Sequence, residues 1–136
     1  MSCPFCEPIG REIVAANELA IAFRDAYPVS DGHTLVVPRR HVASWFEATE
    51  AERAAILTLA DEVKLALDAE LAPDGYNLGV NVGAAAGQTV MHLHVHVIPR
   101  YAGDVDDPAG GVRFVIPGRG NYRRPGAIPR SLGRLK

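Results

Sequence analysis

The chain is poor in cysteine and has no long hydrophobic run. Only two of its 136 residues are cysteines, Cys3 and Cys6, which excludes a disulfide framework. No apolar stretch approaches the ~20 residues that a transmembrane helix needs, so we expect no membrane partner. The N-terminus also lacks the basic and apolar segments of a signal peptide, which favours a cytoplasmic location.

An excess of either charge is also missing. The formal net charge is −2 and the isoelectric point about 6.2, so no global basic field favours nucleic acid as a partner. The C-terminal end is a local exception, with arginines at Arg113, Arg119, Arg123, Arg124, Arg130 and Arg134. This Arg-rich tail either solubilises the chain or contacts nucleotide phosphates.

What the chain does contain is a row of three histidines in a strand-like run. His92, His94 and His96 occupy every second position between apolar residues, so a β-strand would place them on one face. Three titratable rings on one strand face are costly to bury without partners, which indicates binding or chemistry there. The Cα atoms of neighbouring triad members would be about 6.6 Å apart, too far for all three rings to hold one ion easily, and the middle ring is best placed to meet a substrate.

Local patterns predict five strands and one helix. We expect a hairpin of residues 13–16 and 19–24, and strands at residues 33–37, 76–82 and 91–98, with a short strand-like patch at residues 112–116. Thr49 with Glu52 three residues later is a capping box that starts a helix. Apolar residues then recur at helical spacing for five to six turns, and Pro73 ends the helix.

The triad and its companions resemble the histidine triad (HIT) superfamily. The companions are Asn81, Gly83, Gly87, Gln88 and Thr89 before the triad, and residues 22–25 and 33–41 farther upstream. The resemblance covers roughly residues 3–102. The chain is similar to bacterial proteins of the Hint-like and Fhit-like types. It implies an α+β fold, with a five-stranded, largely antiparallel sheet, one long helix and an extended C-terminal tail.

The resemblance also implies a domain organisation. Residues 1–102 would form a HIT-like domain with an N-terminal zinc knuckle, and residues 103–136 a tail that packs on the domain or on a dimer partner. Proteins of this family usually form a two-fold homodimer through the helix and a sheet edge.

For activity, the resemblance implies attack on the α-phosphate of a purine nucleotide conjugate. His94 would be the nucleophile and form a nucleotidyl-histidine intermediate that water then opens. His96 would hydrogen-bond phosphate oxygens and assist proton transfer, with His33 close by. Substrates would be nucleoside phosphoramidates or dinucleoside polyphosphates. Thr89, where the Hint-like branch often has serine, leaves the phosphoramidate assignment unsettled. Residues 110–117 resemble bacterial relatives of the dinucleoside polyphosphate type and favour that substrate class.

The same resemblance assigns substrate contacts to six residues. Asp25 would accept hydrogen bonds from the ribose hydroxyls, although in isolation it reads as an exposed turn acid. Ile21 and Phe23 would wall the purine pocket, with ordinary core positions as the alternative. Asn81, Gln88 and Thr89 would contact the α-phosphate or leaving-group side, beside a Gly/Ala loop that is also explained by an ordinary turn.

Four residues are candidate ligands of a structural zinc ion. Cys3 and Cys6, spaced as a metal half-site, would combine with His41 and His92 into a closed tetrahedral set of two sulfurs and two nitrogens. Some bacterial HIT proteins have such a site. The alternative is a reduced, reactive cysteine pair.

Two other functions remain open at the sequence level. One is a zinc-stabilised nucleotide-binding or scaffold protein with little catalysis, which the intact triad disfavours. The other is a metalloenzyme that uses a His-x-His pair and would need an open ligand position.

Overall fold

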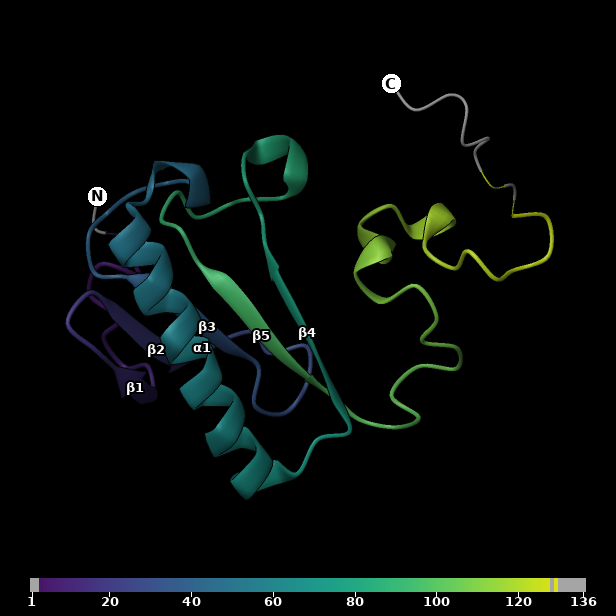
Figure 1. Cartoon of the computed structure of the whole chain (residues 1–136), viewed down its shortest axis with the longest axis horizontal. Helices are drawn as coiled ribbons and strands as arrows, with labels where there is room; N and C mark the ends of the chain where they lie inside the picture. Colours follow the sequence, from purple (N-terminus) through teal and green to yellow (C-terminus); the bar gives the residue numbers. More distant parts are fainter. Residues whose placement is uncertain (1–2, 128, 130–136) are drawn as a thin grey trace. The chain divides into compact units, whose positions relative to one another are not determined.

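The computed structural model describes residues 3–127 and 129, and it confirms the α+β fold. Five strands form one antiparallel sheet in the order β1-β2-β3-β5-β4 (Figure 1). The strands are β1 (Ile13–Ala16), β2 (Ala20–Arg24), β3 (Thr34–Pro38), β4 (Gly75–Val80) and β5 (Val95–Arg100), and the helix is α1 (Glu50–Leu71). The described residues fall into two compact units, and the boundary along the chain lies between Tyr101 and Ala102. No helix within the described residues has the length and apolar character needed to cross a membrane.

The helix α1 begins at the capping box that the sequence predicts. The Thr49 hydroxyl accepts from the Glu52 N–H at 3.1 Å, and the Glu52 carboxylate accepts from the Thr49 N–H at 2.9 Å. Glu52 is buried, and its carboxylate also accepts hydrogen bonds from two N–H groups of Arg40, at 2.7 and 3.0 Å. The helix ends where Ala72 adopts a left-handed conformation before Pro73. One carboxylate therefore fixes the start of α1 and the segment that follows β3.

The two faces of the sheet bury different sets of side chains. On one face Val36, Val95 and Val97 pack with Ile56 and Leu67 of α1 in the larger core cluster. The smaller cluster, which we call the Phe cluster, holds only residues from the strands and the N-terminal segment. Its buried members are Phe5, Phe23, Leu35 and Val37. Strand alternation explains this separation, because neighbouring residues of β3 point to opposite faces.

The triad segment differs from the predicted strand. Strand β5 begins only at Val95, so His92 and His94 precede it and only His96 lies in the ladder. Val95 is the last residue paired with β3, and its partner on β4 is Val80, where β4 ends. Before Val95 the backbone instead makes an isolated hydrogen bond from the Leu93 N–H to the Val42 carbonyl at 2.7 Å. Met91, which strand alternation would place on the face opposite the histidines, is exposed.

The second unit begins at Ala102 and contains two short 3-10 helices, η3 (Gly111–Val115) and η4 (Pro117–Arg119). The predicted strand at residues 112–116 is therefore wrong. Positive φ angles at Gly110 and Gly111 turn the backbone into i→i+3 hydrogen bonds rather than an extended run. Within this unit the Arg113 guanidinium donates to the Gly120 carbonyl at 2.9 Å and lies over the Tyr122 ring, so this arginine has a structural role. Arg130 and Arg134 lie outside the described residues.

Gly32 occupies a position where a side chain does not fit. Its φ is +88°, and a Cβ there would lie 2.6 Å from Leu67 and 2.9 Å from Leu71 of α1. Glycine thus lets the loop before His33 pass directly beneath the C-terminal turns of the helix.

Candidate active site and metal centre

The histidines gather on the sheet face that carries the Phe cluster, away from α1. The register places Phe23, Leu35 and His96 opposite one another on β2, β3 and β5. The Phe5 ring lies 4.9 Å from the His94 ring and 5.4 Å from the Phe23 ring, measured between centroids. The His94 and His96 ring centroids are 5.1 Å apart. The helix-covered face therefore stabilises the sheet, and the other face holds the candidate chemistry.

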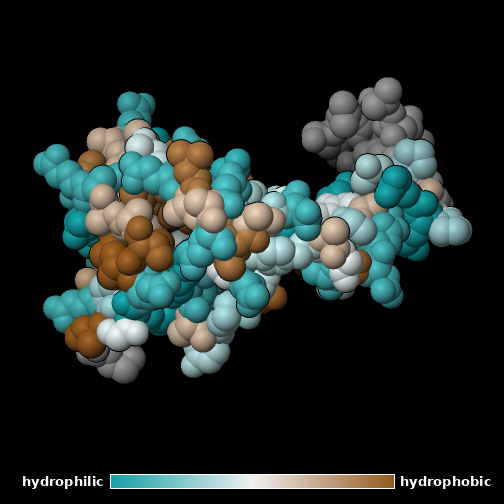
Figure 2. All heavy atoms as spheres, turned by 90° about the horizontal axis from the view of Figure 1, so that it is seen from below, coloured by the Kyte–Doolittle hydropathy of each residue, from teal (hydrophilic) through white to brown (hydrophobic). Residues whose placement is uncertain are grey.

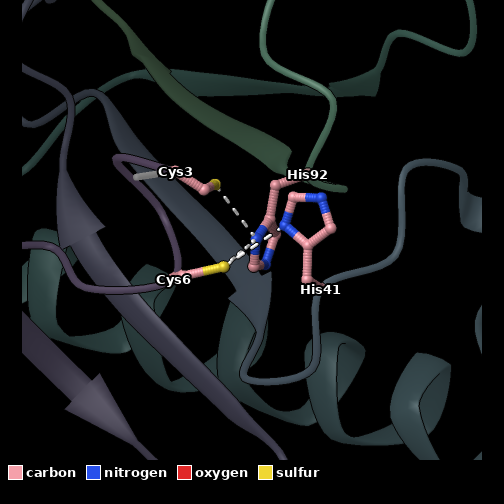
Figure 3. A group of neighbouring side chains, drawn as sticks. All are labelled: Cys3, Cys6, His41 and His92. Atoms are coloured by element: carbon pink, nitrogen blue, oxygen red, sulfur yellow. Dashed lines mark hydrogen bonds between the residues drawn. The ribbon is translucent and has the colours of Figure 1, made fainter. Parts of the chain in front are cut away.

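Cys3, Cys6, His41 and His92 converge on one point. Their ligand atoms all lie within 4.8 Å of one another. The Cys6 Sγ lies 3.2 Å from His41 Nδ1 and 3.5 Å from His92 Nδ1, and the Cys3 Sγ lies 3.5 Å from His92 Nδ1. Figure 3 shows the two thiols and two imidazoles pointing toward one another from three separate segments of the chain. The structure thus brings together the four residues that the sequence predicts as zinc ligands.

The hydrogen bonds around His92 leave the correct nitrogen for a metal. The ring is fully buried, and its Nε2–H donates to the Pro38 carbonyl at 2.8 Å. Nδ1 therefore keeps its lone pair, and it is this nitrogen that faces the thiols. Burial lowers the pKa of His92, which favours the neutral, ligating form. The donor set and this tautomer both fit a tetrahedral zinc ion.

His94 is oriented by the backbone of the metal-ligand candidate. Its Nδ1–H donates to the His92 carbonyl at 2.8 Å. In the neutral ring this bond leaves the lone pair on Nε2, the nitrogen available to attack an electrophile. His94 is only 8% exposed, so its ring is held within the site by its neighbours rather than free in solvent.

A chain of hydrogen bonds fixes the tautomers of His33 and His96. The Val29 N–H donates to His33 Nδ1 at 3.1 Å, so the neutral His33 ring carries its proton on Nε2. That Nε2–H donates to His96 Nδ1 at 2.9 Å. His96 must then carry its own proton on Nε2, which makes it a hydrogen-bond donor beside the Nε2 lone pair of His94.

Asp25, His33 and His96 form a second cluster with metal-ligand composition, within 4.8 Å of one another. Its hydrogen bonds do not fit a metal ion. Because the Val29 N–H occupies His33 Nδ1, the His33 Nε2 that faces the cluster keeps its proton and cannot act as a ligand. This cluster therefore fits hydrogen bonding, and of the two clusters it is the cysteine-containing one whose donors fit a metal ion.

Burial lowers the pKa values of both histidines in the second cluster. For His96, desolvation with smaller contributions from His94 and His33 lowers the pKa to about 4. Burial likewise lowers the pKa of His33, although the nearby Asp25 carboxylate opposes the shift. Both rings are therefore neutral at neutral pH, as the tautomer assignment requires.

Asp25 does not occupy the exposed turn that its isolated context suggests. Its side chain is 15% exposed, and Oδ1 accepts from the Tyr27 N–H at 2.9 Å. Oδ2 lies 3.4 Å from His33 Nε2, which leaves this oxygen capacity to accept a further hydrogen bond.

The residues expected around the purine are divided between core and rim. Phe23 is fully buried within the Phe cluster, and Ile21 packs against that cluster while partly exposed. Phe5 was not predicted as a site residue, yet it contacts the ring of His94. The available sequence signal was an aromatic residue between two candidate metal ligands, a position that a metal knuckle would hold against the site.

The loop before the triad is closed by Gln88. This buried amide accepts from the Gly83 N–H at 2.9 Å and donates to the carbonyls of Ala43 and Val90, at 2.7 and 3.1 Å. Both of its N–H groups are therefore in use, so a contact to phosphate would require one of these bonds to break. Asn81 and Thr89 stand at the two ends of this loop, Thr89 exposed and Asn81 half-buried.

Comparisons with known proteins show the family of this chain. A family model described as "HIT domain" matches residues 8–103. A HIT-like protein of Mycoplasma genitalium is 43% identical over 104 residues, 74% of each chain. The crystal structure of a HIT family protein from Bacillus anthracis matches with a TM-score of 0.71 and 38% identity over 76% of each chain. The chain belongs to the HIT domain family.

Three further relatives carry names that concern nucleotides or zinc. An adenosine 5'-monophosphoramidase of Schizosaccharomyces pombe is 38% identical over 74% of this chain and 75% of its own. An AP-4-A phosphorylase of Mycobacterium tuberculosis is 36% identical over 69% of this chain, which spans about half of that protein (49%). A zinc-bound histidine triad family protein from Mycobacterium smegmatis matches with a TM-score of 0.71 and 30% identity, over 84% of this chain and 90% of its own.

Proposed function

We propose that this protein cleaves purine nucleotide conjugates at the α-phosphate through a nucleotidyl-histidine intermediate. Phosphoramidates and dinucleoside polyphosphates are the two substrate classes, and the names of the phosphoramidase and phosphorylase relatives support nucleotide processing in general. The observation that carries the proposal is the pairing of two ring nitrogens. His94 presents a lone pair on Nε2, and the neighbouring His96 presents an N–H.

These two nitrogens divide the reaction between them. His94 Nε2 attacks phosphorus, a P–N bond forms, and the bond from phosphorus to the leaving group breaks. The neutral His96 donates a hydrogen bond from its Nε2–H to the departing nitrogen or oxygen, which takes its proton from water. The positive charge that develops on the His94 ring is stabilised by the Nδ1–H bond to the His92 carbonyl. Water then attacks phosphorus, releases the nucleoside monophosphate and restores His94.

The test is single-turnover chemistry on a radiolabelled adenosine 5'-phosphoramidate and on a diadenosine polyphosphate. Rapid acid-free quenching of the wild type should trap label on the protein, and His94→Asn should show none while still binding AMP. Asn is chosen because it can keep a hydrogen bond to the His92 carbonyl without supplying the nucleophile. If the wild type traps no label, binds AMP and turns over neither substrate, the result would instead support the alternative, a nucleotide-binding or scaffold protein.

We further propose that Cys3, Cys6, His41 and His92 hold a structural zinc ion. Four protein ligands close the tetrahedral shell, so the ion would tie the N-terminal segment to the triad rather than activate a substrate. The donor set, the His92 tautomer and the zinc-bound mycobacterial relative support this role.

A homodimer and a cytoplasmic location complete the proposal. Strand β4 is an edge of the sheet, and its Leu78 is exposed, as are Leu57 and Leu65 of α1. Figure 2 shows hydrophobic patches among hydrophilic side chains on the face in view. Sedimentation equilibrium should give twice the chain mass; Leu65→Lys and Leu78→Lys together should give the monomer mass. Cys3 and Cys6 are not joined by a disulfide, which suits a reducing compartment.

A further inference from the structure

Arg11 lies beside the aromatic side chains that adjoin the candidate nucleophile. Its guanidinium carbon is 5.8 Å from the Phe5 ring centroid and 5.5 Å from that of Phe23. Phe5 in turn contacts the His94 ring at 4.9 Å. A single aromatic side chain therefore touches both the proposed nucleophile and this arginine. Neither the sequence pattern nor the proposed reaction gives Arg11 a role.

The hydrogen-bonding capacity of Arg11 is unused within the described part of the chain. No acidic side chain among the described residues forms an ion pair with it, and none of their oxygens accepts from its guanidinium. The side chain is half-buried, so its charge is held at the edge of the Phe cluster rather than extended into water. A guanidinium has five N–H donors in a planar fork, and contact with aromatic rings does not require any of them.

The distance between Arg11 and the triad suits one nucleotide. Phe23 and His96 are register partners of Leu35 on either side, so two strand spacings, about 10 Å, separate them. The ribose and base of a nucleotide whose α-phosphate is at His94 cover a similar length. Asp25, one strand position beyond Arg24 on β2, lies at the triad end, with its ligand atom within 4.8 Å of those of His33 and His96.

We infer that Arg11 recognises the purine base and favours guanine over adenine, an inference that rests on the proposed function. The Hoogsteen edge of guanine presents two acceptors, O6 and N7, which match two N–H groups of the guanidinium fork. Adenine presents N7 together with an amino group, so one arginine donor would face another donor. The substrate class is therefore a guanine nucleotide conjugate.

The test compares equilibrium binding of GMP and AMP by calorimetry. The wild type should bind GMP more tightly by about five- to hundredfold. Arg11→Met keeps an unbranched apolar stem over the Phe cluster and should bring the ratio of the two dissociation constants close to one, mainly by weakening GMP. Arg11→Lys keeps the positive charge without the planar guanidinium and should give an intermediate ratio of the two dissociation constants. This variant also tests the inference if the methionine variant does not fold.

Arg53→Met is the matched control. Arg53 is also a guanidinium close to an aromatic ring, 6.0 Å from Trp45, but it lies on α1, away from the triad. This variant should keep the wild-type preference for GMP. A loss of the GMP preference in Arg53→Met overturns the inference. So does an equal weakening of GMP binding and AMP binding in Arg11→Met, which is the result that a contact to phosphate would produce. Equal binding of both nucleotides by the wild type overturns it and leaves the proposed function intact, whereas binding of neither overturns both.

Discussion

At the scale of single residues, the function of each histidine depends on the hydrogen bond that its other nitrogen makes. The Pro38 carbonyl holds the proton of His92 on Nε2 and leaves the Nδ1 lone pair for the proposed metal ion. The His92 carbonyl holds the proton of His94 on Nδ1 and leaves the Nε2 lone pair for the proposed attack on phosphorus. The Val29 N–H does the opposite at His33 and makes its Nε2 a donor. Identical side chains thus acquire different chemistry from three backbone groups.

The first residue-scale prediction concerns Asp25. If its Oδ2 accepts from the ribose diol, Asp25→Ala should weaken ribonucleotide binding about ten- to hundredfold, since a hydrogen bond to a charged group is lost. The 2'-deoxy analogue, which already lacks part of the contact, should lose less. Titration of both ligands against both proteins forms a double-mutant cycle.

The matched control for this cycle is Asp31→Ala, a change at an exposed acid six positions along the same loop. It should leave both affinities at the wild-type value. Equal losses for the two ligands in Asp25→Ala would mean that the carboxylate acts on the fold or on the field of the site, and the assignment to ribose would be wrong.

The second residue-scale prediction follows from the low pKa of His96. Its pKa is about 4 in the folded chain against 6.5 for a free ring, so between these values only the unfolded chain binds the proton. The free energy of unfolding should therefore decrease as the pH falls from 6.5 to about 4. The loss is at most about 3 kcal/mol, and smaller because water reaches part of the ring.

Urea denaturation across this pH range checks the prediction. His96→Asn should show a flatter dependence of the unfolding free energy on pH than the wild type, with the contribution of His33 remaining in both proteins. Parallel curves would show that the His96 ring titrates in the folded chain as it does in water.

At the scale of elements, the start of α1 depends on one buried carboxylate. Hydrogen bonds from Arg40 and from the Thr49 backbone lower the pKa of Glu52 to about 2. Glu52→Ala should reduce the free energy of unfolding by about 2–4 kcal/mol, because three donors lose a charged acceptor. Glu50→Ala, an exposed acid in the same turn, should change it by less than about 1 kcal/mol.

The same carboxylate gives a second pH window. Glu52 titrates at 4.5 when unfolded and at about 2 when folded, so its contribution is complete above pH 4.5 and is lost as the pH falls toward 2. Chemical denaturation of wild type and Glu52→Gln at several pH values separates this window from that of His96. A wild-type stability that does not change below pH 4.5 would contradict the assignment.

The N-terminal segment leads to a prediction about metal content. Protein purified without added metal should contain one zinc ion per chain by elemental analysis. His41→Asn should lose it, and chelation should lower the melting temperature, because metal-binding free energy is folding free energy. His33→Asn is the matched control, since the tautomer of His33 excludes it from ligation, and it should retain one zinc ion. Wild-type protein with a Cys3–Cys6 disulfide and no zinc would contradict the site.

The elements show which parts of the fold can be predicted from sequence. The capping box at Thr49 and the helical spacing after it describe local interactions, and both are present in α1. The start of β5 could not be predicted, because it depends on pairing with residues distant in sequence: Val95 pairs with Val36 of β3 and with Val80, the residue at which β4 ends. The run at residues 112–116 has β-forming residues but follows two glycines with positive φ, and these produce a 3-10 helix.

The candidate site shows the same division. The residue types and spacing of Cys3, Cys6, His41 and His92 were sufficient to predict a cluster that the structure brings together. The tautomers, and the engagement of Gln88 by three backbone groups, could not be predicted, since backbone carbonyls and N–H groups have no sequence signal. Arg11 was missed because its role depends on contacts with Phe5 and Phe23.

At the scale of the whole molecule, one residue joins the stabilising face of the sheet to the reactive one. Gly32 lies against Leu67 and Leu71 of α1 and directly precedes His33, whose ring holds His96. A larger side chain at Gly32 would displace either the helix or this histidine. In a mutational screen scored by turnover, Gly32 should therefore rank with the histidines proposed as catalytic, although it is not among the proposed substrate contacts. A parallel screen scored by protein abundance would distinguish the two cases, and enzyme engineers should leave this position unchanged.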